Sequence, residues 1–458
     1  MKRILAIAGL TWKSAFRYRL FWILAVLLVG AVVGLPLLLK DDGTAKGLTQ
    51  ILLTYTLTAV TALLGIATLW LSCGTMAKDV EECQMQMVTV KPISRWQIWI
   101  GKWLGILGLN AILLAMAGTA IFILLQWRAS HLPAAEQKVL HEEVFVARAS
   151  IREPVPDFGP QIQAEMHARL QKGHYTAAEA AEILKQVTER IISLNTEVPP
   201  EFRRRWVIDL HTLSDKVRSE PFQVRIKFHT ADLNPEGTYM TYWVVGPTNS
   251  TRDVMLRQML PPDSFQQFEI PANLLDEQGR LVVDFYNGNN TSLVFPIEDG
   301  FELLYNENTF GVNFIRGVII IFCWLAFLAT IGLAAASLLS FPVAAFASLA
   351  ILMMGLCSST VSAVVEQGTI TGYDASAGGY GHSPVDLIFV PVFRGMLKVI
   401  QLVESFSPID FLSSGRSITW GQLGLAVTQI ILLLGGIFGV IGIILFTRRE
   451  LATAQGNS

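Results

Sequence analysis

Five long stretches of the chain contain no charged side chain. They cover residues 21–39, 47–77, 103–127, 317–365 and 417–447. Each stretch exceeds the roughly 18 apolar residues that mark a candidate transmembrane helix. The fourth is more than twice the length that a bilayer core of about 30 Å requires, and Pro342 near its middle would break a helix. The pattern therefore predicts six membrane-spanning helices.

The positions of Lys and Arg predict the orientation of these helices. Basic residues precede the first span, lie between the second and third spans, and follow the sixth, which places them all on one side of the membrane. Cytoplasmic loops carry an excess of Lys and Arg, so we expect both termini in the cytoplasm. Residues 128–313 and 366–416 are then on the outer side. The expected setting is the cell membrane, in particular a bacterial inner membrane.

The composition agrees with a membrane protein and excludes other classes. Hydrophobic residues make up 52% of the chain and charged residues 16%, and the mean hydropathy is +0.45, which is too apolar for an ordinary soluble domain. A net charge of -2 gives no reason to expect a nucleic-acid partner. The four cysteines all lie in or beside predicted spans, so no disulfide framework is expected in residues 128–313.

The large outer segment changes its hydrophobic period partway. Residues 134–213 are predicted to be helical, with a capping-box pattern at Thr176 and Glu179. From residue 214 to 308 apolar positions alternate, as at Phe222, Val224 and Ile226, which predicts strands. Strands are expected at 222–228, 239–245, 265–270, 281–286, 293–296 and 301–305. Short strands at such intervals predict a β-sandwich.

The expected fold is therefore an α-helical polytopic membrane protein with a large extracytoplasmic α+β insertion. Its membrane domain comprises residues 1–127 and 314–458, and its insertion covers residues 128–313. Two aromatic residues of the insertion, Tyr242 and Trp243, either form a ligand platform or fill the core. Aromatic residues in strands usually fill a core.

Enzyme signatures are missing from the sequence. We find no GxxxxGK[ST] phosphate loop, no HExxH, no paired CxxC and no GxSxG motif. The seven histidines are scattered and share no ligand spacing with a third partner. We therefore expect no catalytic residue, no metal site and no bound cofactor in this chain.

The segment Lys78–Lys102 gathers seven charged side chains between two uncharged runs. Placing them in the bilayer centre would cost on the order of 20 kcal/mol, at roughly 3 kcal/mol each. The segment, extended to residues 74–102, is therefore predicted to be a cytoplasmic loop. Its apolar and aromatic residues favour a helix along the membrane surface, which is either a docking surface or a solvated connector anchored at the lipid interface.

Several sequence features resemble permease subunits of ABC transporters of the type 2 exporter family. They are a basic amphipathic start, a paired Glu after the second span, KPISRWQIWIGKWLG before the third, SFPVA after the fourth, and FTRRE after the last. The resemblance covers roughly residues 1–127 and 313–450. It is closest to the six-span branch that includes permeases for maturation of nitrous oxide reductase.

The resemblance implies a function for the charged loop. In the family this loop carries the coupling helix that docks on a separate ATPase, which binds the ATP and magnesium. The implied contact residues, with their neighbours in the loop, are Lys78, Asp79, Glu81, Glu82, Lys91, Pro92, Ser94, Arg95 and Trp96. Ser340, Phe341 and Pro342 form a second cytoplasmic turn. Cys83-Gln84 stands where the family commonly has Gly-Thr, and the outer insertion is larger than the family norm.

The segment between the fifth and sixth spans contains an amphipathic pattern. One apolar stripe holds Phe393, Met396, Leu397, Ile400 and Val403, whereas Arg394, Lys398 and Gln401 lie off it. This pattern is typical of an interfacial amphipathic helix, here on the outer side of the membrane. A helix packed under the outer domain is the alternative.

Two functions fit the sequence. The first is a permease that works as a homodimer or with a second permease, couples ATP hydrolysis by a separate ATPase to transport, and acts as an exporter. The second is a non-transporting membrane scaffold or sensor whose outer domain binds a glycan or an envelope protein. The uncharged runs hold no ionisable residue that would mark an ion path.

Overall fold

The computed structural model describes residues 2–17, 20–39, 43–81, 93–153, 156–170, 177–210, 221–230, 237–247, 253–271, 274–276, 278–297, 299–370, 373–374, 379–380 and 385–449. The chain divides into two compact units. The first, which we name the helical unit, comprises Met1–Ala147 and Asn308–Ser458; the second, the β-rich unit, comprises Arg148–Glu307. Each unit is described by itself.

The helical unit contains helices of very different lengths. Its α-helices are α1 (Lys2–Arg17), α2 (Leu20–Leu38), α3 (Ala45–Thr49), α4 (Leu57–Glu81), α6 (Arg95–Ala129), α7 (Ala134–Val139), α11 (Phe310–Leu338), α12 (Phe341–Leu356), α13 (Ser358–Gln367), α14 (Asp386–Glu404), α15 (Pro408–Ser413), α16 (Trp420–Ala426) and α17 (Gly436–Arg448). Three π-helical stretches, η1 (Gln50–Thr56), η2 (Leu140–Val144) and η3 (Val427–Gly435), and a strand pair, β12 (Tyr373–Asp374) with β13 (Gly379–Tyr380), complete it.

Five helices in the described residues are long and apolar enough to cross a membrane. They are Phe21–Leu38, Gly47–Glu81, Arg95–Ala129, Phe310–Leu338 and Trp420–Arg448. The prediction of helices that are long and apolar enough to span a membrane is therefore confirmed for these five. The fifth predicted span is divided into α12 and α13 at Cys357, and the 16 residues of α12 reach only about 24 Å. The polar run Cys357, Ser358, Ser359 and Thr360 explains the break, because short polar side chains compete for helix hydrogen bonds.

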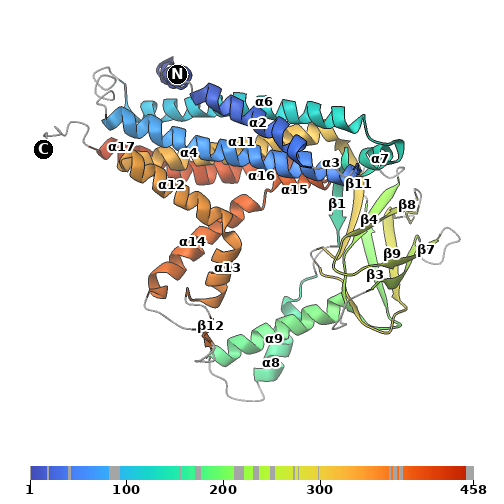
Figure 1. The fold of residues 1–458 in the computed structure, drawn as a ribbon. Coiled ribbons are helices and arrows are strands. Elements are labelled where there is room, and N and C mark those ends of the chain that lie inside the picture. Colours follow the sequence, from blue (N-terminus) through green and yellow to red (C-terminus); the bar gives the residue numbers. More distant parts are fainter. Residues whose placement is uncertain are drawn as a thin grey trace. The chain divides into compact units, whose positions relative to one another are not determined.

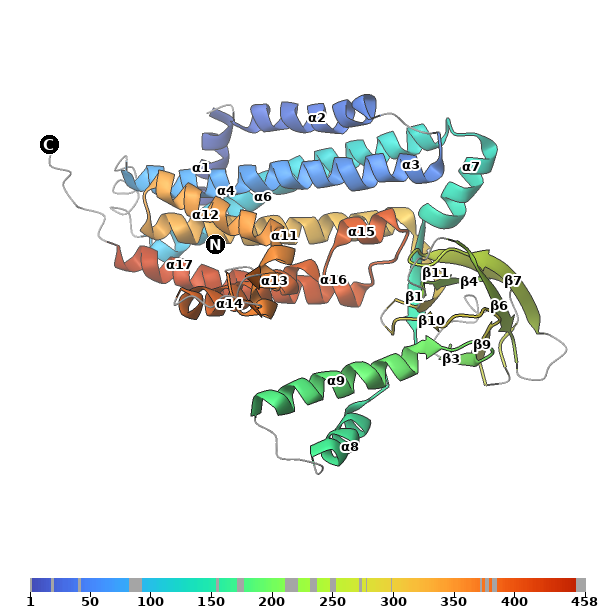
Figure 2. The same cartoon turned by 60° about the horizontal axis from the view of Figure 1, so that its bottom comes forward.

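Helix α11 is the centre of the helical unit. It packs against α4, α6, α12 and α17, and these long helices run side by side in both Figure 1 and Figure 2. Small residues permit the close approach, since a Cβ added at Gly332 would lie 1.9 Å from Ser72 Oγ of α4, and one at Gly442 would lie 3.1 Å from Ala334 Cβ. Small residues at helix interfaces are typical of membrane bundles, where packing replaces the hydrophobic effect.

The amphipathic helix α1 packs on α6 at Gly101, Gly105 and Gly108. An added Cβ at Gly101 would lie 2.7 Å from Ile7 Cβ, and one at Gly105 would lie 2.7 Å from Thr11 Cβ. Trp12 Nε1 donates a hydrogen bond of 2.8 Å to the Gly105 carbonyl. The glycines on α6 therefore form the groove that holds α1.

Replacing Gly101 and Gly105 together by Leu should detach α1 from α6. Forcing large side chains into a packed contact costs about 1–3 kcal/mol per site, and neither glycine leaves room for a side chain. Trypsin should then cleave at Lys13 in the variant faster than in the wild type. Gly30→Leu on α2 is the matched control, because a Cβ there meets no atom within 4 Å. Equal cleavage of all three proteins would contradict this packing.

The β-rich unit contains most of the strands. They are β1 (Val146–Arg152), β2 (Glu197–Val198), β3 (Arg203–Asp209), β4 (Phe222–Ile226), β5 (His229–Thr230), β6 (Tyr239–Val245), β7 (Val254–Leu260), β8 (Gln266–Ile270), β9 (Arg280–Asn287), β10 (Leu293–Val294) and β11 (Phe301–Thr309). Two four-stranded sheets have the orders β1-β11-β4-β8 and β3-β9-β6-β7, and a three-stranded sheet has the order β2-β10-β5. The six strands expected from residue 222 onward are confirmed.

One apolar core joins side chains from both four-stranded sheets. It contains Val224 and Phe268 of the first sheet together with Trp206, Trp243 and Phe285 of the second. The Trp206 and Trp243 rings stack with their centroids 5.9 Å apart. Trp243 is fully buried, so it fills the core, whereas Tyr242 lies on the opposite face of the same strand.

The region predicted to be helical differs from the expectation. It contains helices α8 (Gly159–Leu170) and α9 (Ala177–Thr196), and in α9 Val187 and Ile191 are buried, whereas Leu184 and Leu194 are exposed. Thr176 lies outside the described residues. However, β1, β2 and β3 also belong to this region. The alternation in β3 is masked by its three arginines, although Trp206 and Ile208 point into the core.

Candidate functional site

The last turn of α4 contacts the start of α12. The Phe341 backbone N–H donates a hydrogen bond of 2.9 Å to Glu81 Oε1, and Lys78 Nζ lies 5.0 Å from the centroid of the Phe341 ring. Pro342 occupies the first turn of α12, where its missing N–H is tolerated. A carboxylate at a helix N-terminus is favourable because free N–H groups and the helix dipole face it. Glu81 therefore joins the end of α4 to the start of α12.

A second polar contact joins α4 to α6 one turn deeper. Lys102 Nζ forms an ion pair with Asp79 Oδ2 and donates a hydrogen bond of 2.5 Å to the Thr75 carbonyl. The Lys102 side chain is only 7% exposed, whereas that of Asp79 is 37% exposed. The buried ammonium group of Lys102 is therefore paired with a carboxylate, that of Asp79, which contacts solvent.

Arginine side chains cap the C-terminal ends of α17 and α11. Arg95, the first residue of α6, donates hydrogen bonds of 3.1, 2.8 and 2.7 Å to the carbonyls of Phe446, Thr447 and Arg449 at the end of α17. Arg449 in turn donates to the carbonyls of Ala336 and Ser337 near the end of α11. Cations at helix C-termini satisfy free carbonyls and the negative end of the dipole.

These contacts define one surface, which we name the polar end of the helical unit. It comprises the last turns of α4, α11 and α17 and the first turns of α6 and α12. The surface brings together most of the residues that sequence analysis singled out: Lys78, Asp79, Glu81, Ser94, Arg95, Trp96, Ser340, Phe341 and Pro342. Glu82, Lys91 and Pro92 lie outside the described residues.

The predicted residues of the polar end differ in whether a partner could contact them. Lys78, Glu81, Ser94 and Trp96 are exposed, with Trp96 at 45%. Arg95, by contrast, directs hydrogen bonds to its own chain. The sequence analysis missed Lys102 and Arg449 as site residues, although each is a cation at the edge of an apolar run. No group of three His, Cys, Asp or Glu side chains in the described part of the chain could hold a metal.

The amphipathic stripe before the last span lies on α14. Phe393, Met396, Leu397, Ile400 and Val403 are all half-buried, whereas Arg394, Lys398 and Gln401 are exposed. The first turns of α14 also expose apolar side chains, since Leu387 is 84% and Ile388 65% exposed. The helix therefore has one packed apolar stripe and a separate exposed apolar start.

Helix α11 contains a buried cation directly before the uncharged run that begins at residue 317. Helix α11 begins at Phe310, seven residues before the uncharged run, and includes Arg316, which is 2% exposed. Its Nη1 donates a hydrogen bond of 2.7 Å to the Ile418 carbonyl, and its guanidinium lies 4.4 Å from the Trp420 ring centroid. Arg316 therefore fixes the chain that leads into α16.

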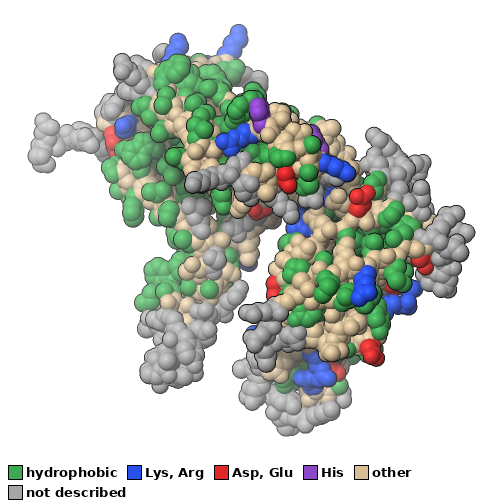
Figure 3. All heavy atoms as spheres, turned by 45° about the vertical axis from the view of Figure 1, so that its right-hand side comes forward, with side chains coloured by type: hydrophobic (Ala, Val, Ile, Leu, Met, Phe, Trp, Pro, Cys, Tyr) green, Lys and Arg blue, Asp and Glu red, His purple; other side chains and the backbone are tan. Residues whose placement is uncertain are grey.

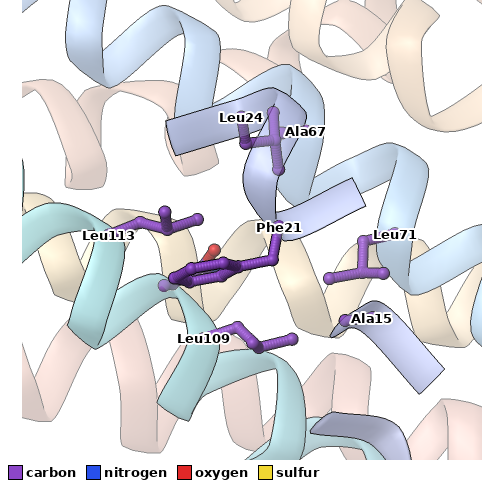
Figure 4. Close-up of a pocket in the computed structure, with 8 residues that line it drawn as sticks. Ala15, Phe21, Leu24, Ala67, Leu71, Leu109 and Leu113 are labelled. Atoms are coloured by element: carbon purple, nitrogen blue, oxygen red, sulfur yellow. The ribbon is translucent and has the colours of Figure 1, made fainter. Parts of the chain in front are cut away.

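One space in the apolar interior of the helical unit is too small for a ligand. A space of about 10 Å³ between α1, α2, α4 and α6 is lined by Ala15, Phe21, Leu71, Leu109 and Asn110 among others. Figure 4 shows the Phe21 ring directed toward Leu109 and Leu113. This volume is at the lower limit for one water. A substrate could not bind there.

Two larger apolar grooves lie on either side of α6. The groove between α2 and α6 has a volume of about 540 Å³, and the groove between α6 and α11 has about 590 Å³. Ala115 and Thr119 of α6 line both grooves. These grooves have the shape to accept apolar chains or helices, but they carry no charged side chain.

Comparison with known proteins gives no family for this chain. No protein-family model, no characterised protein and no solved structure matches it. The function must therefore be inferred from the polar end, from the spans and from the sequence features described above.

Proposed function

We propose that the chain is the membrane-spanning permease subunit of an ABC transporter, with ATP hydrolysis supplied by a separate ATPase subunit. The observation that supports this most strongly is the polar end. There, Glu81 in the last turn of α4 and Phe341 in the first turn of α12 tie these two helices into a single surface. A docking surface needs such ties, because a force applied at one loop must move several helices together.

The contacts suggest how ATP binding would act on the helices. Closure of the ATPase subunits would displace residues 78–102. Glu81 would pass this movement to α12, Lys102 with Asp79 would hold α4 and α6 together, and Arg95 would pass it to α17. The spans would then rearrange to move a substrate, with export as the proposed direction. ATP and magnesium would stay on the ATPase, and this chain would bind no cofactor.

The proposal includes the finer features of the topology. We place the chain in a bacterial inner membrane with both termini cytoplasmic, and we count α12 with α13 as a broken fifth span, which gives six spans in all. The two four-stranded sheets of the β-rich unit would form a β-sandwich on the outer side, because their side chains share one core. The start of α14, with its exposed Leu387 and Ile388, would lie in the outer lipid interface.

We also propose that two permeases pair in the membrane, as a homodimer or with a second permease. The apolar grooves on either side of α6 provide surfaces against which another helix could pack. Small residues such as Ala115, Gly118 and Thr119 allow the close approach that membrane helices use.

Trp96→Ala should reduce the amount of ATPase that co-purifies with the chain by about thirtyfold. Truncating an aromatic anchor in an interface costs about 2 kcal/mol or more, and each 1.4 kcal/mol corresponds to about tenfold in affinity. The tagged full-length chain is purified from its native membranes, and magnesium-dependent ATP hydrolysis is measured per mole of chain.

Trp127→Ala is the matched control. Trp127 is 58% exposed and lies on the same helix, about 46 Å from Trp96 at a rise of about 1.5 Å per residue. It should leave ATPase recovery unchanged. If Trp96→Ala keeps wild-type recovery, or if Trp127→Ala alone reduces it, the proposed docking end is wrong. If no ATPase accompanies the wild type, the scaffold or sensor function is favoured instead.

A further inference from the structure

One face of the β3-β9-β6-β7 sheet points away from the core. Since successive side chains of a strand alternate between faces, this face carries the residues that alternate with the core positions. We name it the Arg–Tyr–Met face. It comprises Arg203, Arg205, Val207, Asp209, Met240, Tyr242, Val244, Met255, Arg257, Met259, Arg280, Val282, Asp284 and Tyr286.

The composition of this face is unusual for a sheet that only meets water. Solvated sheet faces normally carry polar side chains, yet these positions include no Lys, Glu, Ser or Thr. Tyr, Met and Arg are the residues enriched at protein interfaces, whereas Lys, Glu and Ser are depleted there. Several apolar members are also accessible, since Met255 is 73% and Met259 60% exposed, although Val282 is buried. The face therefore has the composition of an interface.

The strand register places four of these residues in one row. Arg203 pairs with Tyr286, Tyr286 with Tyr242, and Tyr242 with Arg257. At about 4.8 Å between strands, the row spans about 14 Å from one arginine to the other. The two tyrosines lie between the arginines, with ring centroids 6.2 Å apart. An aromatic centre is thus flanked by a cation on each side.

The positive charges of the face are only partly neutralised by aspartates of the same chain. Arg205 forms two hydrogen bonds of 2.8 and 2.9 Å with the Asp284 carboxylate, and these raise the pKa of the Arg205 guanidinium. Arg203 lies 3.8 Å from the same carboxylate. Arg257 lies over the Tyr242 ring at 5.5 Å, and no ion pair joins it to a carboxylate in the described residues. Arg280 forms an ion pair of 2.9 Å with Asp276, so four arginines are balanced by Asp209, Asp284 and Asp276, and a net charge of +1 remains.

We propose that the Arg–Tyr–Met face binds a protein partner whose surface presents carboxylates on either side of an apolar or aromatic side chain. The positive charge excludes a second copy of the same face, because like charges would meet across a two-fold axis. A glycan is a poorer fit, since the tyrosine rings are inclined by 61° and cannot stack together on one flat sugar chain. Figure 3 shows basic and hydrophobic side chains mixed over the β-rich unit.

Selection from a random peptide library tests this proposal. The library, displayed on phage, is selected against the full-length chain in lipid nanodiscs. The recovered peptides should carry Asp or Glu next to Trp, Tyr or Leu. Their affinity should fall at least about tenfold for the triple variant Arg203→Glu, Tyr242→Ala, Arg257→Glu, because truncating or reversing contact residues of this kind commonly costs more than 1.4 kcal/mol.

A control variant and a second ligand show which results would contradict the proposal. Glu269→Lys reverses an exposed charge on the other four-stranded sheet and should leave peptide affinity unchanged. Peptides without acidic bias, or peptides that bind the triple variant as well as the wild type, would overturn the proposal. It would also fail if polygalacturonate, an acidic polysaccharide, binds the wild type but not the triple variant while no peptide does. None of these outcomes depends on whether an ATPase docks at the polar end.

Discussion

Asp79→Asn is expected to lower the free energy of unfolding of the helical unit by about 3 kcal/mol, because removing one member of a buried ion pair leaves the other charge uncompensated. The remaining charge would be on Lys102, whose side chain is only 7% exposed. It would keep the Thr75 carbonyl and a neutral amide oxygen as acceptors, but no anion. The measurement is equilibrium unfolding of the purified chain in mixed micelles, followed by tryptophan fluorescence.

Replacing the cation of the pair instead of the anion should lower the free energy of unfolding much less. Lys102→Met leaves Asp79, which is 37% exposed and can be solvated by water, and it adds an apolar side chain at a buried position. The double variant Asp79→Leu, Lys102→Met should recover most of the stability, since replacing both members of a buried pair by apolar residues is often neutral. Equal losses for the two single variants would contradict the asymmetric burial on which this prediction depends.

The spans and many strands could be predicted from sequence because their physical causes are local. A helix that crosses lipid needs an uninterrupted apolar length, and a half-buried strand needs alternation. Strand β7 was missed because the methionines on its exposed face, Met255 and Met259, give no polar alternation. Strand β3 was missed because arginines occupy its first three positions. Arg316 was missed because the uncharged run begins one residue after it, whereas α11 begins before it.

The candidate site could be predicted only in part. The residues of the charged loop and of the second turn were identified as two separate segments, but the contact between Glu81 and Phe341 joins positions 260 residues apart. The direction of a side chain depends on tertiary packing that no local pattern encodes. For this reason Arg95 was expected to face an ATPase, whereas its described hydrogen bonds go to the carbonyls of α17. The partner and the substrate depend on molecules that the chain itself does not encode.

Arg95→Glu is expected to lower the free energy of unfolding by about 2–4 kcal/mol. Hydrogen bonds to charged groups contribute about 1.5–3 kcal/mol each when formed, and a cation at a helix C-terminus adds up to about 2 kcal/mol. The carbonyls of Phe446, Thr447 and Arg449 all accept from the same nitrogen, Nη1, which has only two N–H groups, so the variant loses at most two full hydrogen bonds at a partly exposed site. It also places a carboxylate against carbonyl oxygens. Urea or SDS titration of the purified variant, with the yield of folded protein, measures the loss.

Arg95→Lys and Trp96→Ala separate this stabilising role from docking. Lysine keeps the charge, but its side chain ends one bond short of the position that Arg95 Nη1 occupies against the three carbonyls, so Arg95→Lys should lose about half as much stability. Trp96, the exposed neighbour, should tolerate Ala within about 0.5 kcal/mol and lose only the ATPase. If Arg95→Glu instead unfolds like the wild type and loses the ATPase, then Arg95 faces the partner, and the cap on α17 does not stabilise the fold.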